Sequence, residues 1–154
     1  MAITSDTISN AMILEINTAY PDIPIYEETI QQGAERPYFL ISEIDMFQHK
    51  EKTNKYDRLY QMKVEYDVEI NDPEQNSKLK AMGEALMDII DTINVEVGNG
   101  AKSYPVIGRF IDYKIVNDEL QFFVSYPIRV YKETVAETLQ GSLKINTNIK
   151  NGGN

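Results

Sequence analysis

The chain has 154 residues, with 15 Lys and Arg against 24 Asp and Glu, so its formal net charge is −9. It contains no Cys, which excludes disulfide frameworks, thiol nucleophiles and Cys-containing zinc sites, and its one His (His49) cannot build a His-rich metal cluster. An acidic chain also disfavours DNA or RNA binding, which requires clustered Lys and Arg. A chain of this length predicts one domain.

Helical spacing of apolar residues predicts a first helix over residues 6–20, with Ser5 as its N-cap. Proline ends this helix, and residues 23–27 are predicted to be a short extended segment. A strand is predicted to begin near Tyr38, and residues 49–55, which are mostly charged, are predicted to form a loop that carries His49.

The clearest pattern is a strict alternation of apolar and polar residues over 60–70, which predicts a long strand with one buried face. Pro73 then favours the start of a long central helix, predicted over 73–92. After a turn at 98–100, two strands are predicted over 106–117 and 119–132, joined by a tight Asn117-Asp118 turn. Pro127 indicates an edge or a bulge in the second of them.

This order of elements predicts an α+β fold: one mainly antiparallel sheet packed by an N-terminal helix and a long central helix, with a C-terminal extension. Residues 1–133 are the predicted domain and residues 134–154 the extension, whose end is expected to be flexible. Within the extension, Leu143, Ile145 and Ile149 alternate with polar residues, which indicates a further strand without a local partner.

No motif predicts catalysis. Residues 98–103 (GNGAKS) lack the spacing of a phosphate-binding loop, and no Gly-x-Ser-x-Gly elbow is present. Glu84 and Asp88 lie four residues apart on the predicted helix, where a solvated face explains them. We therefore expect no enzymatic activity, no cofactor and no metal. No segment approaches the length of a membrane span, so no membrane partner is expected either.

One polar feature is less ordinary. Glu65, Asp67 and Glu69 are predicted to share the wet face of the long strand, at intervals of about 6.5–7 Å. Like charges so placed require water, cations or a selected negative potential. A solvated face is the default interpretation, a calcium site is disfavoured because the backbone is straight, and a functional electrostatic surface is the third option.

Several segments of the sequence resemble the phage tail terminator family of small neck proteins. The segments that carry the resemblance are PIYEE at 24–28, QQG at 31–33, PYFLI at 37–41, Arg58, and YDVEIN at 66–71. The similarity extends over roughly residues 1–92, and the strand pair and the tail follow in the expected order.

The resemblance implies a structural virion protein, assembled in the host cytoplasm, that forms a homo-hexameric ring. Such a ring caps the tail tube, stops its growth and joins the tail to the head connector or neck protein, and in contractile tails it also meets the sheath. The implied partners are further copies of the chain and these tail and neck proteins. The alternative interpretation is a small soluble ligand-binding or adaptor domain without catalysis.

Within the implied ring, two sets of residues become candidates for function. The strand of Leu143, Ile145 and Ile149 is a candidate subunit-interface extension that adds to a neighbour's sheet, with packing on its own domain and disorder as the alternatives. The face of Glu65, Asp67 and Glu69 is a candidate lumen face, where negative charge would let DNA pass as cargo without adhering.

Overall fold

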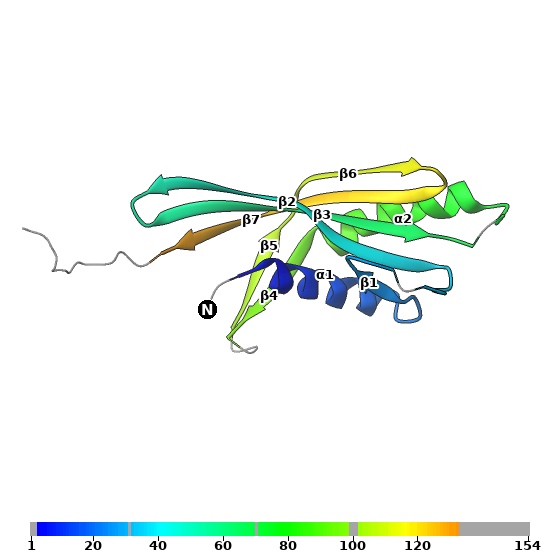
Figure 1. Ribbon diagram of the computed structural model, residues 1–154, viewed down its shortest axis with the longest axis horizontal. Coiled ribbons are helices and arrows are strands. Elements are labelled where there is room, and N and C mark those ends of the chain that lie inside the picture. Colours follow the sequence, from blue (N-terminus) through cyan, green and yellow to red (C-terminus); the bar gives the residue numbers. More distant parts are fainter. Residues whose placement is uncertain (1–2, 31, 70, 99–101, 133–154) are drawn as a thin grey trace, which may run out of the picture. The chain divides into compact units, whose positions relative to one another are not determined.

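The computed structural model describes residues 3–30, 32–69, 71–98 and 102–132. The chain falls into two units, one of Met1–Phe47 with Arg58–Ile128 and one of Gln48–Asp57 with Arg129–Asn154. In chain order the elements, labelled in Figure 1, are α1 (Ser5–Ala19), β1 (Ile25–Glu27), β2 (Tyr38–Lys52), β3 (Lys55–Asp67), α2 (Gln75–Ile89), β4 (Thr92–Val97), β5 (Lys102–Ile107), β6 (Arg109–Val116) and β7 (Glu119–Tyr131). The candidate strand of Leu143, Ile145 and Ile149 lies outside the described residues.

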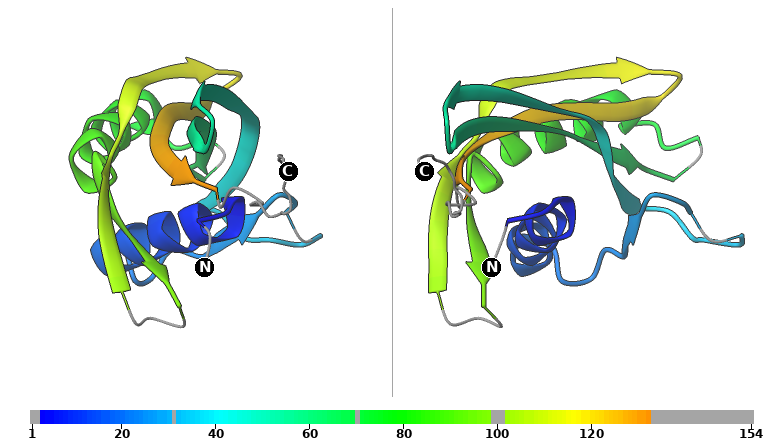
Figure 2. Two further views of the ribbon diagram at one scale, coloured as in Figure 1. Left: turned by 90° about the vertical axis from the view of Figure 1, so that its left-hand side faces the viewer. Right: turned by 60° about the vertical axis from the view of Figure 1, so that its left-hand side comes forward.

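The strands form two sheets, one more than predicted. A five-stranded sheet has the order β1-β2-β3-β7-β6, and β4 and β5 form a two-stranded sheet of their own. β1 runs parallel to β2, whereas β6 and β7 are antiparallel and are joined by the predicted turn, in which Asn117 and Asp118 both have positive φ. Both helices lie on the same side of the five-stranded sheet (Figure 2). The predicted α+β class with a mostly antiparallel sheet and two helices is confirmed.

The core forms where the alternating strands face the helices. On β3 the predicted apolar face of Tyr60, Met62, Val64 and Tyr66 is buried. The matching face of β7 is buried as well, through Leu120, Phe122, Val124, Tyr126 and Ile128. β6 begins opposite Ser125, so Pro127 lies beyond the last β6–β7 pair, where its missing N–H costs no ladder hydrogen bond.

Helix α1 begins one residue before the predicted start. Thr4, rather than Ser5, is the N-cap, and it exchanges capping hydrogen bonds with Thr7. The predicted stripe of this helix is buried through Ile8, Met12 and Ile16.

Helix α2 is shorter than predicted, since it ends at Ile89 rather than near Thr92. Ile90, Ile93 and Val95 are all fully buried, and the last two alternate with exposed residues in β4. Such a β-branched apolar run fits either period, and here strand pairing with β5 prevails over the helical one. The predicted packing of a long central helix is therefore not what the chain forms.

The single strand predicted over 106–117 is interrupted at Gly108, which separates β5 from β6. The Gly108 N–H donates a 2.6 Å hydrogen bond to the carbonyl oxygen of Asp91. A Cβ at position 108 would lie 2.8 Å from Cγ2 of Val124 and 3.0 Å from that same oxygen. Only a residue without a side chain therefore fits where the chain passes from one sheet to the other.

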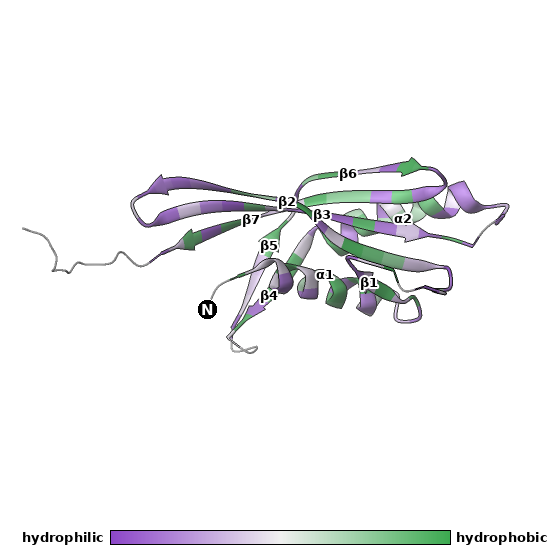
Figure 3. Ribbon diagram, in the orientation of Figure 1, coloured by the Kyte–Doolittle hydropathy of each residue, from purple (hydrophilic) through white to green (hydrophobic). Residues whose placement is uncertain are grey.

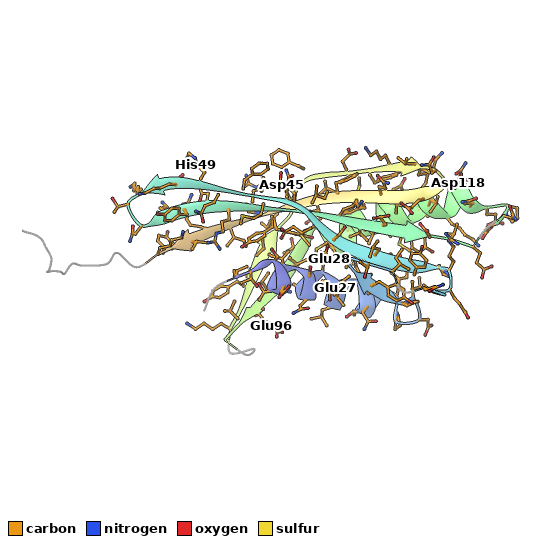
Figure 4. The ribbon with its side chains drawn as sticks, viewed as in Figure 1. Glu27, Glu28, Asp45, His49, Glu96 and Asp118 are labelled. Atoms are coloured by element: carbon orange, nitrogen blue, oxygen red, sulfur yellow. The ribbon has the colours of Figure 1, made fainter. Side chains whose placement is uncertain are left out.

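The charged loop predicted over 49–55 is wrong, because β2 continues to Lys52 and β3 begins at Lys55. Strand pairing there depends on backbone hydrogen bonds rather than on an apolar face, so hydropathy alternation gives no signal. Figure 3 shows the hydrophilic character of this tip. His49 lies within β2 with its side chain exposed (Figure 4).

Candidate functional site: an acidic hollow and unpartnered surfaces

The first unit contains a polar hollow of about 260 Å³ where β3 ends and β7 begins, which we call the acidic hollow. Figure 4 marks Asp118 beside it, in the β6–β7 turn. The lining residues come from four parts of the chain and are Arg36, Asp67, Val68, Asn71, Gln75, Asn117, Asp118 and Glu119. Gln75 closes one side, since its side-chain amide donates a 3.1 Å hydrogen bond to the Asp118 carbonyl oxygen.

Asp67 is the central residue of the hollow and is only 6% exposed. Its Oδ2 accepts hydrogen bonds from the Tyr38 hydroxyl at 2.9 Å and from the Arg36 guanidinium at 3.4 Å. Its Oδ1 is buried and has no hydrogen-bond partner among the described residues. A buried carboxylate oxygen without a donor is costly, which points to a donor that the described residues do not supply.

The predicted wet face of three acidic residues is therefore wrong at Asp67. The expectation came from strand alternation, but at the end of β3 both faces are covered, so Tyr66, Asp67 and Val68 are buried in succession. Glu69 lies beyond the end of β3 and is exposed. Glu65 is half-buried and pairs with Lys63 at 3.0 Å. The structure thus separates the three carboxylates into different environments.

Glu119 is a residue that the sequence analysis missed. Burial, together with the negative charges of the Asp67 and Glu65 carboxylates, raises the pKa of its carboxyl to about 8. Burial also raises the pKa of the Tyr38 hydroxyl, which donates to Asp67. No periodic signal marks Glu119, because it is the first residue of β7 and approaches Glu65 and Asp67 only through the pairing of β3 with β7.

The Glu119 carboxyl predicts that stability falls as the pH rises. Between its ordinary pKa of 4.5 and about 8, the folded chain holds a proton that the unfolded chain has lost, so deprotonation favours unfolding. The free energy of unfolding should therefore decrease across this window. Glu119→Gln should flatten the decrease and raise stability at pH 8. Urea titrations at pH 5, 6.5 and 8 measure this, with Glu96→Gln as control, and an unchanged slope in Glu119→Gln would contradict it.

Away from the hollow, large apolar side chains are exposed on strand surfaces. They are Ile44, Met46 and Phe47 on β2, Tyr104 and Ile107 on β5, Phe110 on β6 and Tyr131 on β7. Phe110 is 75% exposed and has φ of 54°, at the irregularity in the β6–β7 register between Arg109 and Asp112. A left-handed conformation costs an aromatic residue about 1–3 kcal/mol, and such strain concentrates at functional positions.

The second unit is basic, in contrast to the chain as a whole. Its described residues, 48–57 and 129–132, contain five Lys or Arg and two Asp or Glu, whereas the whole chain has a net charge of −9.

Several of these charges are paired within the unit. Arg129 is bound to Asp57 at 2.9 Å, and Lys55 and Arg129 each lie 3.6 Å from Glu51. Lys132 lies over the ring of Tyr56 at 4.1 Å. We call the β2–β3 part of this unit the basic hairpin.

Apolar side chains are thus exposed on the strands, and the charges of the described residues are segregated between the two units. In the described part of the chain, no group of three or more His, Cys, Asp or Glu is arranged to hold a metal ion. No helix among these residues is long and apolar enough to cross a bilayer.

Comparison with known proteins then gives the family. The family described as phage tail terminator protein matches residues 7–138, so the chain belongs to the phage tail terminator family. The family is structural, which makes the chain a virion component of a phage tail that interacts with other tail or head proteins. The family predicted from the sequence is thereby confirmed.

Two further comparisons add little. No curated protein matches the chain. A solved structure, whose title gives no function, aligns with 86% of this chain and 99% of its own at 11% identity and a TM-score of 0.40. A likeness at that level carries no argument.

Proposed function

We propose that this chain is a tail terminator that forms a homo-hexameric ring, caps the tail tube, stops its growth and joins the tail to the head connector. The observation that carries the proposal is the family match over residues 7–138. In a contractile tail the ring would also meet the sheath. The chain would assemble in the host cytoplasm, without cofactor or enzymatic activity, from a domain of residues 1–133 and an extension of residues 134–154.

The surface of the chain supports assembly. A closed ring needs two different patches on each subunit, because its contacts are head-to-tail. Aromatic and Met side chains are enriched in such contacts. In the isolated chain the ring of Phe110 is exposed, so its burial does not offset the strain of the left-handed backbone. A partner that buries the ring would offset that strain.

Tube growth in vitro tests the proposed role. Tubes polymerised from the cognate tube protein should stop elongating when this chain is added, at about one ring per tube end. Electron-microscopic length distributions measure the effect, with an equal amount of heat-unfolded chain as control. Tubes that elongate equally with and without the folded chain would refute termination.

The extension suggests a second contact. We propose that the strand of Leu143, Ile145 and Ile149 adds to the sheet of a neighbouring subunit. Truncation before Gly141 should then lower the hexamer fraction at least tenfold in native mass spectra, whereas removal of residues 151–154 alone should not. An unchanged hexamer mass after the longer truncation would sink this idea.

Because Asp67 is buried, the lumen hypothesis now concerns the other two acidic residues of the predicted face, Glu65 and Glu69. We propose that Glu65 and Glu69 face the lumen of the ring and repel DNA phosphates. Glu65→Lys with Glu69→Lys should give complete tails that eject DNA several-fold more slowly. Glu84→Lys with Asp88→Lys is the charge-matched control on α2, and normal ejection by the Glu65/Glu69 variant would count against the hypothesis.

A further inference from the structure

The charge of this chain is divided between its two units. The described residues of the second unit hold an excess of Lys and Arg in a chain of net charge −9, so the first unit carries the acidic charge. A subunit with opposite charges on two different patches is complementary to a second copy of itself in a head-to-tail arrangement. Electrostatic complementarity of this kind sets the register of a contact.

Among the described residues, the acidic hollow lacks one donor. Arg36 and Tyr38 both bind Oδ2 of Asp67, and no described residue donates to Oδ1, in a side chain that is more than nine-tenths buried. Because Oδ1 is buried, a donor reaches it only by entering the hollow that Asp67 lines. A volume of about 260 Å³ is sufficient for an ammonium group with the end of its side chain.

The second unit, which contains the basic hairpin, has such donors to offer. Arg129 and Lys55 are paired with Glu51 or Asp57, and Lys132 lies on Tyr56. Lys52 is exposed and has no ion pair among the described residues. The Lys50 ammonium nitrogen lies 6.0 Å from the centre of the Tyr56 ring, at the outer limit of a cation–π contact. The two lysines are two residues apart in β2, so they project from the same face of the strand.

We propose that Lys50 and Lys52 of one copy dock into the acidic hollow of a neighbouring copy, where Asp67 and Glu119 receive their ammonium groups. This contact rests on the proposed ring and would form its head-to-tail interface. A Lys side chain suits the hollow better than a divalent cation, since calcium requires six to eight converging oxygen ligands. An ammonium group needs only a few acceptors, and the hollow offers them on one side.

Charge reversal tests the contact between copies. Lys50→Glu with Lys52→Glu should lower the ring fraction at tube ends at least tenfold, and Glu119→Lys should do the same. The controls have matched net charge and lie on other elements: Lys80→Glu with Lys102→Glu for the hairpin, and Glu96→Lys for the hollow. Circular dichroism and thermal unfolding of each variant confirm that it folds.

Mixing the two variants gives the decisive result. Neither variant should form rings alone, but a 1:1 mixture should, because an alternating hexamer pairs every reversed hairpin with a reversed hollow and every native hairpin with a native hollow. If the mixture forms no rings but a single chain carrying all three substitutions does, the contact lies inside one subunit and the proposal is overturned.

The failure of this proposal is distinguishable from the failure of the function. If the wild-type chain forms rings and the hairpin variant matches its control, the docking contact is refuted while termination stands. If the hairpin variant forms rings but alters DNA ejection, the lysines face DNA and the docking contact is again refuted. If the wild-type chain caps no tube, the proposed function itself falls.

Discussion

Phe39→Ala is expected to lower the free energy of unfolding by about 3–5 kcal/mol, the range for truncating a buried Phe. Phe39 is fully buried in β2, with its ring 4.9 Å from the ring of Tyr66 and 5.9 Å from that of Tyr20. It also pairs with Ile25, which anchors β1 to the sheet. The substitution would therefore leave a cavity where α1, β1 and β3 meet.

The same strand supplies the matched control. Phe47 is 52% exposed, so Phe47→Ala should change the free energy of unfolding by less than about 0.5 kcal/mol. If Phe47 lies in a ring interface, its truncation should weaken assembly while Phe39→Ala weakens folding. Chemical denaturation of both variants measures the difference, and equal losses of stability would show that the burial assigned to β2 is wrong.

Gly108→Ala is the second substitution with a large expected effect, a loss of about 1–3 kcal/mol from overpacking. The new Cβ would meet the buried side chain of Val124 and the backbone oxygen of Asp91 at 3.0 Å or less. The β-branched Val124 is restricted at χ1 and Asp91 is held by its hydrogen bond to Gly108, so neither yields easily without a shift of β5 or β7.

A double-mutant cycle isolates the cause. Val124→Ala removes the methyl group that the new Cβ would meet, so Gly108→Ala should cost less in that background than in the wild type. Thermal and urea unfolding of the four proteins give the coupling free energy. If the two substitutions were strictly additive, the close approach at Gly108 would not be the source of the loss.

Much of the fold was predictable because most elements carry their own local signal. Tyr60, Met62, Val64 and Tyr66 alternate with polar residues, and they are buried as expected. The Asn117-Asp118 turn adopts the positive φ angles that a tight hairpin demands. The family was recognisable from segments such as residues 37–41, and since Tyr38, Phe39, Leu40 and Ile41 are all buried, that segment records the core rather than a site.

The errors arose where local pattern and tertiary structure disagree. The run from Ile89 to Val95 fits a helix or a strand, and its pairing with β5 decides the outcome. The hairpin tip has no apolar face, so its strands are invisible to periodicity. Gly108 ends a strand because of neighbours that come from β7 and from Asp91, which follows the C-cap of α2, and no local window contains both.

The acidic hollow was the least predictable feature. Asp67 was expected in water because alternation alone cannot reveal that Arg36 and Tyr38 cover the end of β3. Glu119 joins Asp67 from a strand more than fifty positions away in the sequence, and its pKa is raised by burial that no sequence pattern encodes. Charge segregation between the units likewise needed the structure, since the basic residues come from two separate segments.

Cryo-electron microscopy of tube ends tests the central claim most directly. Tubes assembled with the purified chain should carry, at the growing end only, a closed ring of six copies whose density fits this fold. That ring should be absent from tubes assembled without the chain, which should also be longer. Density for the chain along the tube walls, or bare ends on tubes of normal length, would contradict the account.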